Sequence, residues 1–196
     1  DKEILDMELI LKDLETLDKR LESLQKDARA GKKEALKELE VLKKAKKILE
    51  EGKILASQPL EDEEIKIING YQLLTSKPRL YLLNGRDEEV SAVILETFKK
   101  NNWPFLVVDV LAEFEAVDFK KEERQDFGLS LEPELDILIK KSYELLNLIT
   151  FFTTGPDETR AWTVKKGCRA PQAGGAIHSD FESHFIKAEV INWQDL

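Results

Sequence analysis

The sequence predicts a mixed α and β protein that begins with a long helical hairpin. Three observations predict this class. Apolar residues follow a helical repeat through the first fifty or so residues. Two short apolar runs, 80–83 and 105–108, flank an amphipathic helical stretch. The last part of the chain combines alternating apolar segments with glycines and prolines. At 196 residues, the chain is long enough for one or two domains.

The first predicted element is a helical hairpin over about 3–51. Its first helix carries the alternating three- and four-residue spacings of a coiled-coil seam, at Met7, Ile10, Leu14, Leu17, Leu21, Leu24 and Ala28. Ala30-Gly31-Lys32 interrupts the pattern and predicts a short turn, so the second helix should run antiparallel to the first. That helix should end at Gly52. Its apolar residues are Ala35, Leu36, Leu39, Leu42, Ala45, Ile48 and Leu49.

The middle of the chain predicts an α/β unit. A short helix over 61–75 leads into a strand at 80–83, which should be buried on both faces. A helix over 89–101 and a second buried strand at 105–108 complete a β-α-β unit. Two such strands do not make an independent sheet, so they should need partner strands. A further helix over 122–147 bridges to the last region.

The last region predicts strands joined by a basic loop. An apolar strand at 161–164 runs into a loop over 165–175, and an alternating strand follows at 185–191. Trp162 should pack in the core of this sheet. Such a loop can hold its backbone open for a partner that approaches closely. The residues that punctuate it are Gly167, Pro171, Gly174 and Gly175.

Composition excludes several classes of protein. The net charge is −9, so any contact with RNA must come from a local patch. A single cysteine, Cys168, rules out an internal disulfide and a multi-thiolate metal site, and it fits a reducing compartment. No apolar run is long enough for a bilayer and no signal peptide heads the chain, which predicts a cytoplasmic protein without a membrane partner. A helical pattern already present by Glu3, after Asp1, predicts that the chain begins inside something larger.

Asn84-Gly85-Arg86-Asp87 is the candidate ligand-binding loop. It directly follows a buried strand, the place where α/β folds bind ligands. The N-x-x-D spacing is that of a purine-recognition loop. There Asn84 would stabilise the loop and offer its amide to the base, and Asp87 would accept from ring N–H and amino groups. The candidate base-binding residues are therefore Asn84, Gly85 and Asp87. The alternative is an ordinary turn, because the same residue types are common in turns.

Basic residues at two places are candidates for contact with RNA phosphate. One place is the hairpin tip, with Lys32 and Lys33 and the nearby Lys43-Lys44 and Lys46-Lys47 pairs. The other is the last region, with Arg160, Lys165, Lys166 and Arg169. For both, the alternative is a solvated charged surface with weak ion pairs.

Other chemistries are not supported by the residue pattern. His178 and His184, with nearby acids, are six residues apart, which matches no common metal-ligand spacing. Ser179 and Asp180 are chain neighbours of His178 and cannot normally converge as a catalytic relay. Cys168 lacks a visible base or oxyanion site, which favours an inert thiol over a nucleophile. The sequence predicts neither a catalytic residue nor a metal site.

Phosphate-binding motifs do not occur in the sequence. There is no G-x-x-x-x-G-K-[ST] and no D-x-x-G metal loop, so nothing predicts a cradle for a triphosphate or its Mg²⁺. Phosphoryl transfer depends on those charges. We therefore expect this chain alone neither to hold a nucleotide nor to hydrolyse one.

Two runs of residues resemble the YchF family, the Obg-like P-loop ATPases. One run is RAWT, KG, APQ and IH-x-DFE between Arg160 and Glu182, and the other is LLTSKPRLYLLN before the N-x-x-D loop. The resemblance extends over the whole chain and implies three domains. These are a coiled-coil hairpin (1–58), the C-terminal half of a P-loop nucleotide domain (59–147) and an incomplete β-grasp TGS domain (148–196). It also implies that the phosphate-binding half lies upstream of residue 1.

The resemblance implies a ribosome-associated, nucleotide-dependent switch ATPase, with ATP or GTP and Mg²⁺ in the full-length protein. Asn84, Gly85 and Asp87 would then hold the base, while the hairpin and the TGS loop would contact ribosomal RNA or protein. The alternative is a non-enzymatic adaptor that binds RNA or the ribosome. The missing phosphate loop favours the adaptor, whereas the N-x-x-D loop disfavours it.

Two departures from the family pattern bear on the choice of base. Asp87 stands where the family usually has Glu and is the acid found in guanine-specific loops, which keeps guanine open as an alternative. Asp109-Val110-Leu111 replaces a Ser-Ala-Lys-like loop that backs the base. Gly85 occupies the position of the lysine that favours guanine. On balance the sequence predicts a preference for ATP over GTP.

Overall fold

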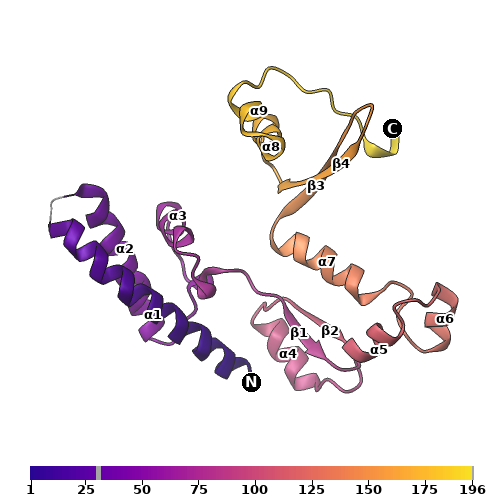
Figure 1. The fold of residues 1–196 in the computed structure, drawn as a ribbon. Helices are drawn as coiled ribbons and strands as arrows, with labels where there is room; N and C mark the ends of the chain where they lie inside the picture. Colours follow the sequence, from indigo (N-terminus) through magenta and orange to yellow (C-terminus); the bar gives the residue numbers. More distant parts are fainter. Residues whose placement is uncertain (30–31, 196) are drawn as a thin grey trace. The chain divides into compact units, whose positions relative to one another are not determined.

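The structure is a computed structural model that describes residues 1–29 and 32–195 (Figure 1). It divides into two compact units, Asp1–Pro78 and the part from Arg79 onward. The predicted mixed α and β class is confirmed. The three-domain boundaries at 58/59 and 147/148 stay predictions, although the first compact unit extends past the hairpin to Pro78.

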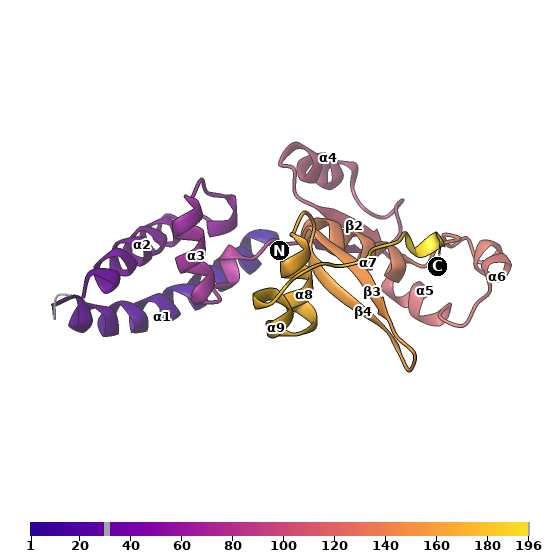
Figure 2. The ribbon, with the colours of Figure 1, turned by 90° about the horizontal axis from the view of Figure 1, so that it is seen from above.

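The first unit is built on two long helices. Helix α1 (Lys2–Arg29) and helix α2 (Lys33–Glu50) lie side by side in both views (Figures 1 and 2) and confirm the two predicted helices. The predicted turn at 30–31 lies outside the described residues. Much of the predicted seam forms the core: Ile10, Leu17, Leu21, Leu24, Ala35, Leu42, Ala45 and Leu49.

Met7 departs from the predicted seam and is exposed. The ion pair between Asp18 and Lys46 shows how the two helices are aligned. With antiparallel helices in that register, Met7 lies opposite chain beyond Glu50, where α2 has already ended. The apolar repeat therefore continues past the end of α2, where Ile10 still joins the buried cluster but Met7 does not.

A short helical segment closes the first unit. It comprises η1 (Leu55–Ser57), α3 (Asp62–Gly70) and η2 (Leu74–Ser76), and its apolar side chains join the hairpin core. The single helix predicted over 61–75 is wrong after Gly70, where α3 ends. Gln72 adopts a left-handed backbone (φ 56°), which breaks the helix before η2.

The second unit begins with the predicted β-α-β unit. Strand β1 (Tyr81–Asn84) pairs in parallel with β2 (Phe105–Val108), and α4 (Ala92–Lys100) connects them. Phe98 on α4 packs edge-to-face against rings on both strands. The expectation that the first strand is buried on both faces is wrong, because Leu82 is 47% exposed. Among the described residues this sheet has only two strands, and the face of β1 that carries Leu82 and Asn84 is exposed.

Three helices follow β2, and the last two stand where one long helix was predicted. They are α5 (Val110–Glu115), α6 (Lys121–Asp126) and α7 (Glu134–Leu145). The continuous helix expected over 122–147 is wrong. Gly128 adopts φ 71° after α6, and Pro133 directly precedes α7, so the chain turns twice between them.

The last part of the chain forms a hairpin and two short helices. Strand β3 (Leu148–Thr154) pairs antiparallel with β4 (Thr159–Lys165), which contains the predicted strand 161–164. Helices α8 (Ala170–Ile177) and α9 (Ser179–Ser183) come next, then a 3-10 turn, η3 (Trp193–Asp195). Helix α8 contacts β4.

Two predictions in this region are wrong. The open loop expected over 165–175 ends early, because Pro171 lies in the first turn of α8 and favours helix initiation there. The strand expected over 185–191 does not form, and Ile186 is 91% exposed. Alternation of apolar and polar residues alone does not make a strand, because the backbone N–H and C=O groups also need a neighbouring strand as hydrogen-bond partner. In the described residues the sheet of β3 and β4 has no further strand.

Candidate functional site

The candidate site lies where the parallel strands β1 and β2 end. The Gly85 backbone N–H donates to Val108 O at 3.0 Å and carries the ladder one residue beyond β1. Gly85 has φ 140°, a conformation that residues with a Cβ rarely adopt. An added Cβ would also lie 3.2 Å from Glu89 Oε2. A glycine is therefore required where the chain leaves the strand.

Asn84 ties this loop to the loop after β2. Its side-chain Oδ1 accepts a hydrogen bond from the Val110 backbone N–H at 3.2 Å. The chain of Val110 follows the neighbouring strand, so one amide side chain bridges the carboxyl ends of both strands. This is a loop-stabilising contact of the kind expected for the asparagine.

A second bridge joins the same two loops. Arg86 Nε donates to Asp109 Oδ2 at 3.3 Å, while Asp109 Oδ1 accepts from the Ala112 N–H at 3.0 Å and caps α5. The Ala112 N–H, followed by the Arg86 guanidinium, holds the pKa of Asp109 below its usual range. The sequence pattern did not predict this pair. An acid directly after β2 and three residues before Ala112 is an N-cap signal that would have indicated α5.

Asp87 lies at the apex of a closed turn. The Arg86 N–H donates to Glu89 Oε2 at 3.0 Å, and the Glu89 N–H donates back to Arg86 O at 2.9 Å. Asp87 is exposed there and borders an open hollow of about 510 Å³ that runs along β2. Glu134 and Lys141 on α7 border the same hollow, and Lys141 Nζ donates to Phe105 O on β2 at 3.3 Å.

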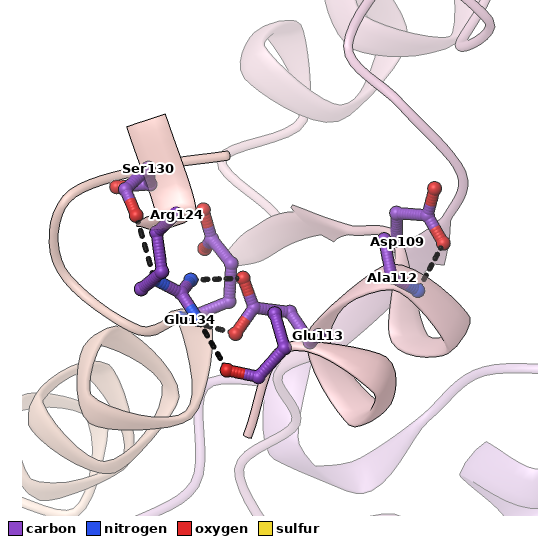
Figure 3. Close-up of polar contacts among 7 residues, drawn as sticks. Asp109, Ala112, Glu113, Arg124, Ser130 and Glu134 are labelled. Atoms are coloured by element: carbon purple, nitrogen blue, oxygen red, sulfur yellow. Dashed lines mark hydrogen bonds and ion pairs between the residues drawn. The ribbon is translucent and has the colours of Figure 1, made fainter. Parts of the chain in front are cut away.

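A buried arginine fixes the helix that carries Glu134 (Figure 3). Arg124 donates through Nη2 to Glu113 Oε1 at 2.6 Å and through Nε to Ser130 O at 2.9 Å. The other oxygen of Glu113 accepts from the Glu134 N–H at 3.2 Å, at the first residue of α7. Burial raises the pKa of Glu134, and the neighbouring carboxylates of Glu113 and Asp87 raise it further. No sequence pattern predicted this network, because its members lie on three separate elements.

Three of the six candidate lysines of the hairpin form ion pairs. Lys32 pairs with Asp27 at 2.9 Å, and Lys33 is exposed at the start of α2. Behind them, Lys44 pairs with Glu64 at 2.7 Å and Lys46 with Asp18 at 2.6 Å. Such exposed pairs are weak and rearrange readily when a stronger partner arrives.

The basic residues of the last region do not all converge. Lys165, Lys166 and Arg169 lie close in sequence around the connection from β4 to α8, and all three are exposed. Lys165 Nζ donates to Leu146 O at 2.8 Å. Arg160 lies on the opposite face of β4, where its guanidinium stacks 4.5 Å from the centre of the Trp162 ring. Trp162 is half-buried and donates to Thr153 Oγ1 at 2.9 Å.

The remaining reactive groups have local roles. His178 Nδ1 accepts from the Asp180 N–H at 3.3 Å, next to the start of α9. Cys168 is a half-buried free thiol. Within 1–29 and 32–195, no group of three or more His, Cys, Asp or Glu residues is placed to hold a metal ion. In the same ranges no helix is both long and apolar enough to cross a bilayer.

Comparison with known proteins gives consistent matches. Residues 148–196 match the family model YchF-GTPase_C, whose description reads "Protein of unknown function (DUF933)". The chain is 42% identical over 207 residues to the ribosome-binding ATPase YchF of Bacillus subtilis, covering all of this chain and 57% of that protein. It is 39% identical to Obg-like ATPase 1 of Xenopus laevis, covering all of this chain and 53% of that one.

A solved structure also resembles this one. The YchF GTPase of Schizosaccharomyces pombe superposes with a TM-score of 0.71 at 30% sequence identity. The match covers 95% of this chain and 54% of that chain. The chain therefore spans about half the length of the relatives that it matches.

Proposed function

The chain belongs to the family of YchF and Obg-like ATPases, and from that premise we propose that it supplies the purine-recognition loop and a ribosome-contacting surface of a nucleotide-dependent ATPase. The relatives are named as ribosome-binding ATPases, and the chain covers about half of their length. Phosphate and Mg²⁺ binding are assigned to the half of the family's nucleotide domain that this sequence lacks. Catalysis is assigned there too.

The arrangement of Asn84 carries the nucleotide part of the proposal. Its bond to the Val110 N–H and the Arg86–Asp109 pair hold two loops together at the carboxyl ends of parallel strands. Open α/β sheets bind ligands at that edge. A simple surface turn needs no such bridges to a neighbouring loop. The exposed carboxylate of Asp87 is thereby held on a fixed support, ready to accept from the N–H groups of a purine.

The base is proposed to be adenine. Gly85 stands in place of the lysine that favours guanine. Helix α5 begins directly after Asp109, so the loop after β2 has no serine hydroxyl to offer the base. It presents its backbone instead, and the Val110 N–H of that backbone is bonded to Asn84. Asp87 is one methylene shorter than the usual glutamate, which leaves room at the edge of the base. Replacing it by glutamate should therefore preserve the preference for ATP.

Calorimetric titration with ATP and with GTP tests this function. We compare residues 1–196 with the same chain joined to the phosphate-binding half of a relative, both in the presence of Mg²⁺. We expect binding of ATP in preference to GTP by the joined protein and no measurable binding by residues 1–196. In the joined protein, Asp87→Ala should weaken ATP binding about tenfold or more, which corresponds to roughly 1.4 kcal/mol.

Glu88→Ala is the matched control, because Glu88 is an exposed acid in the same turn. It should leave ATP affinity unchanged. Equal loss from both variants would show a general charge effect instead of base recognition. Tight ATP binding by residues 1–196 alone would contradict the assignment of the phosphate cradle to the other half.

The ribosome-contacting surface is proposed from the basic residues. Lys165, Lys166 and Arg169 are exposed around one short connection, and Lys32 and Lys33 lie by the hairpin turn. Replacing the first three by glutamine should reduce cosedimentation with ribosomes and lower its dependence on salt. The adaptor alternative predicts the same loss, but cosedimentation would then be independent of nucleotide. The two readings are therefore compared in the joined protein, which can bind ATP, and there an ATPase predicts that ATP changes cosedimentation.

A further inference from the structure

The β3–β4 hairpin has two chemically different faces. Side chains alternate across a strand, and the register pairs Phe151 with Trp162 on one face and Phe152 with Ala161 on the other. The Trp162 face is the more buried, since Phe151, Thr153, Trp162 and Val164 are all partly covered. The opposite face carries Phe152, which is 56% exposed.

Phe152 is uncovered because its neighbours are small. Ala161, its cross-strand partner, has only a methyl group. The rows on either side are threonine pairs, Thr150 with Thr163 and Thr154 with Thr159. The Thr154 and Thr159 hydroxyls lie 3.1 Å apart, and Tyr143 OH lies 3.2 Å from Thr163 Oγ1. The result is one open aromatic ring between two rows of hydroxyl groups.

The charge along this face is polarised. Lys165 lies on the same face at the open end of the hairpin, paired with Leu148, and Lys166 follows it. Asp157 and Glu158 lie at the other end, in the turn between the strands. On β4, Ala161 (the cross-strand partner of Phe152) and Lys165 are four residues apart, which is about 13 Å at roughly 3.3 Å per residue. A polyanion on this face would therefore place its phosphates toward the lysines and away from the turn.

This combination fits nucleic acid better than a protein surface. Protein interfaces centre on several packed apolar side chains, whereas the Phe152 ring is flanked on this face by hydroxyl-bearing side chains. Proteins that bind unpaired strands combine exposed aromatic rings, on which bases stack, with a nearby positive track for phosphate. Bases within a duplex are already stacked and do not offer their faces.

Resting on the ribosome-contacting function proposed above, we infer that the Phe152 face of the β3–β4 hairpin binds an unpaired segment of RNA. A base stacks on the Phe152 ring, the flanking threonines bond to base or sugar, and Lys165 and Lys166 contact phosphates. Arg160 lies on the other face and takes no part.

Fluorescence anisotropy tests the inference with a labelled single-stranded oligoribonucleotide of about twelve nucleotides, a length in the range that such sites cover. The same strand annealed to its complement is the comparison. Phe152→Leu should weaken single-strand binding about 5- to 100-fold, the range for loss of one stacked base. Phe152→Trp should retain binding. Replacing Lys165 and Lys166 together by glutamine, which keeps a donor for Leu146 O, should lower the salt slope by roughly 1 to 2.

Phe127→Leu is the matched control, because Phe127 is another exposed ring (71%) in the second unit but lies outside the hairpin. It should bind the single strand as the unmodified chain does. Unchanged binding by Phe152→Leu, or an equal loss for single strand and duplex, would overturn the inference. So would a loss of ribosome cosedimentation without any loss of oligonucleotide binding, which would identify a protein contact. Failure of the unmodified chain to bind RNA would refute both this inference and the RNA contact it rests on, while ATP titration would still test the nucleotide function.

Discussion

At the residue scale, Asp13 is a carboxylate buried inside the first unit, with 2% of its surface exposed. It accepts three hydrogen bonds from the segment that precedes β1. These come from the Leu74 N–H at 2.9 Å, the Thr75 N–H at 2.7 Å and the Thr75 hydroxyl at 2.6 Å. A buried charge is tolerated only when it is fully bonded, and these donors supply that bonding. Asp13 therefore fixes η2 to α1.

Replacing Asp13 by alanine should lower the free energy of unfolding of the first unit by about 2–4 kcal/mol. The buried Thr75 N–H and hydroxyl would lose an acceptor to which water has no access, and such unpaired groups are costly. Urea unfolding followed by far-ultraviolet circular dichroism measures the change. Asp18→Ala is the control on the same helix: Asp18 forms an exposed pair with Lys46, so it should cost less than about 1 kcal/mol. Equal costs for the two variants would show that burial of Asp13 is unimportant.

The difference between Asn84 and Asp13 shows what a sequence reveals about single residues. Asn84 stands directly after an apolar strand, and that local pattern predicted a ligand loop. Asp13 lies in a helix full of charges, where the pattern predicts a solvated side chain. Its partners are 61 and 62 residues away in the chain. A contact of that range leaves no local signal. The Arg124 network was missed for the same reason.

At the element scale, helices α8 and α9 pack closely through glycines. A Cβ on Gly174 would lie 3.3 Å from both Phe181 Cβ and Phe181 O on α9. A Cβ on Gly175 would lie 3.1 Å from Glu182 Cβ. Glycine in a helix costs about 0.5–1 kcal/mol relative to alanine, so these two glycines weaken α8 by themselves. Their benefit is the close approach of α9.

The double change Gly174→Ala and Gly175→Ala should detach α9 while making α8 a better helix. Amide exchange measured by NMR should become faster at Phe181 and His184, whose N–H groups bond within this turn. Gly70→Ala is the control, because Gly70 is also a helical glycine, at the end of α3, but an added Cβ there would meet no atom within 4 Å. It should leave the α8 and α9 amides unchanged and stabilise α3 by up to about 1 kcal/mol. Unchanged exchange in α9 would refute the packing argument.

Elements with a strong local period were predicted well, and elements that depend on partners were not. The two hairpin helices and the strand at 105–108 were found because their apolar patterns are long or uninterrupted. The strand expected at 185–191 has the alternation of a strand but no neighbour to pair with in the described sheets. The helix expected over 122–147 overlooked Gly128 and Pro133. Helix α5 was missed because it spans only six residues, which is too short for a helical apolar repeat to stand out.

At the scale of the whole molecule, the core is unevenly distributed. Its contiguous buried cluster, from Ile10 to Leu73, lies entirely in the first unit. The second unit buries few apolar residues, namely Phe98, Leu106, Val108 and Ala116. It also contains two separate two-stranded sheets, which are marginal as independent structures. Composition gave no sign that the buried core is concentrated in the first unit, because apolar residues are plentiful in both units. Only the packing of the folded chain decides which of these residues are buried and which are exposed.

We therefore expect the second unit to unfold at a lower urea concentration than the first. The chain offers separate probes, because its three tryptophans, Trp103, Trp162 and Trp193, all lie in the second unit. The two longest helices, α1 and α2, lie in the first. Tryptophan fluorescence should change first and helical circular dichroism later, so that the two transitions do not coincide. Asp13→Ala should move only the later transition. Coincident transitions by both probes, shifted together by Asp13→Ala, would instead require that the two units unfold as one cooperative structure.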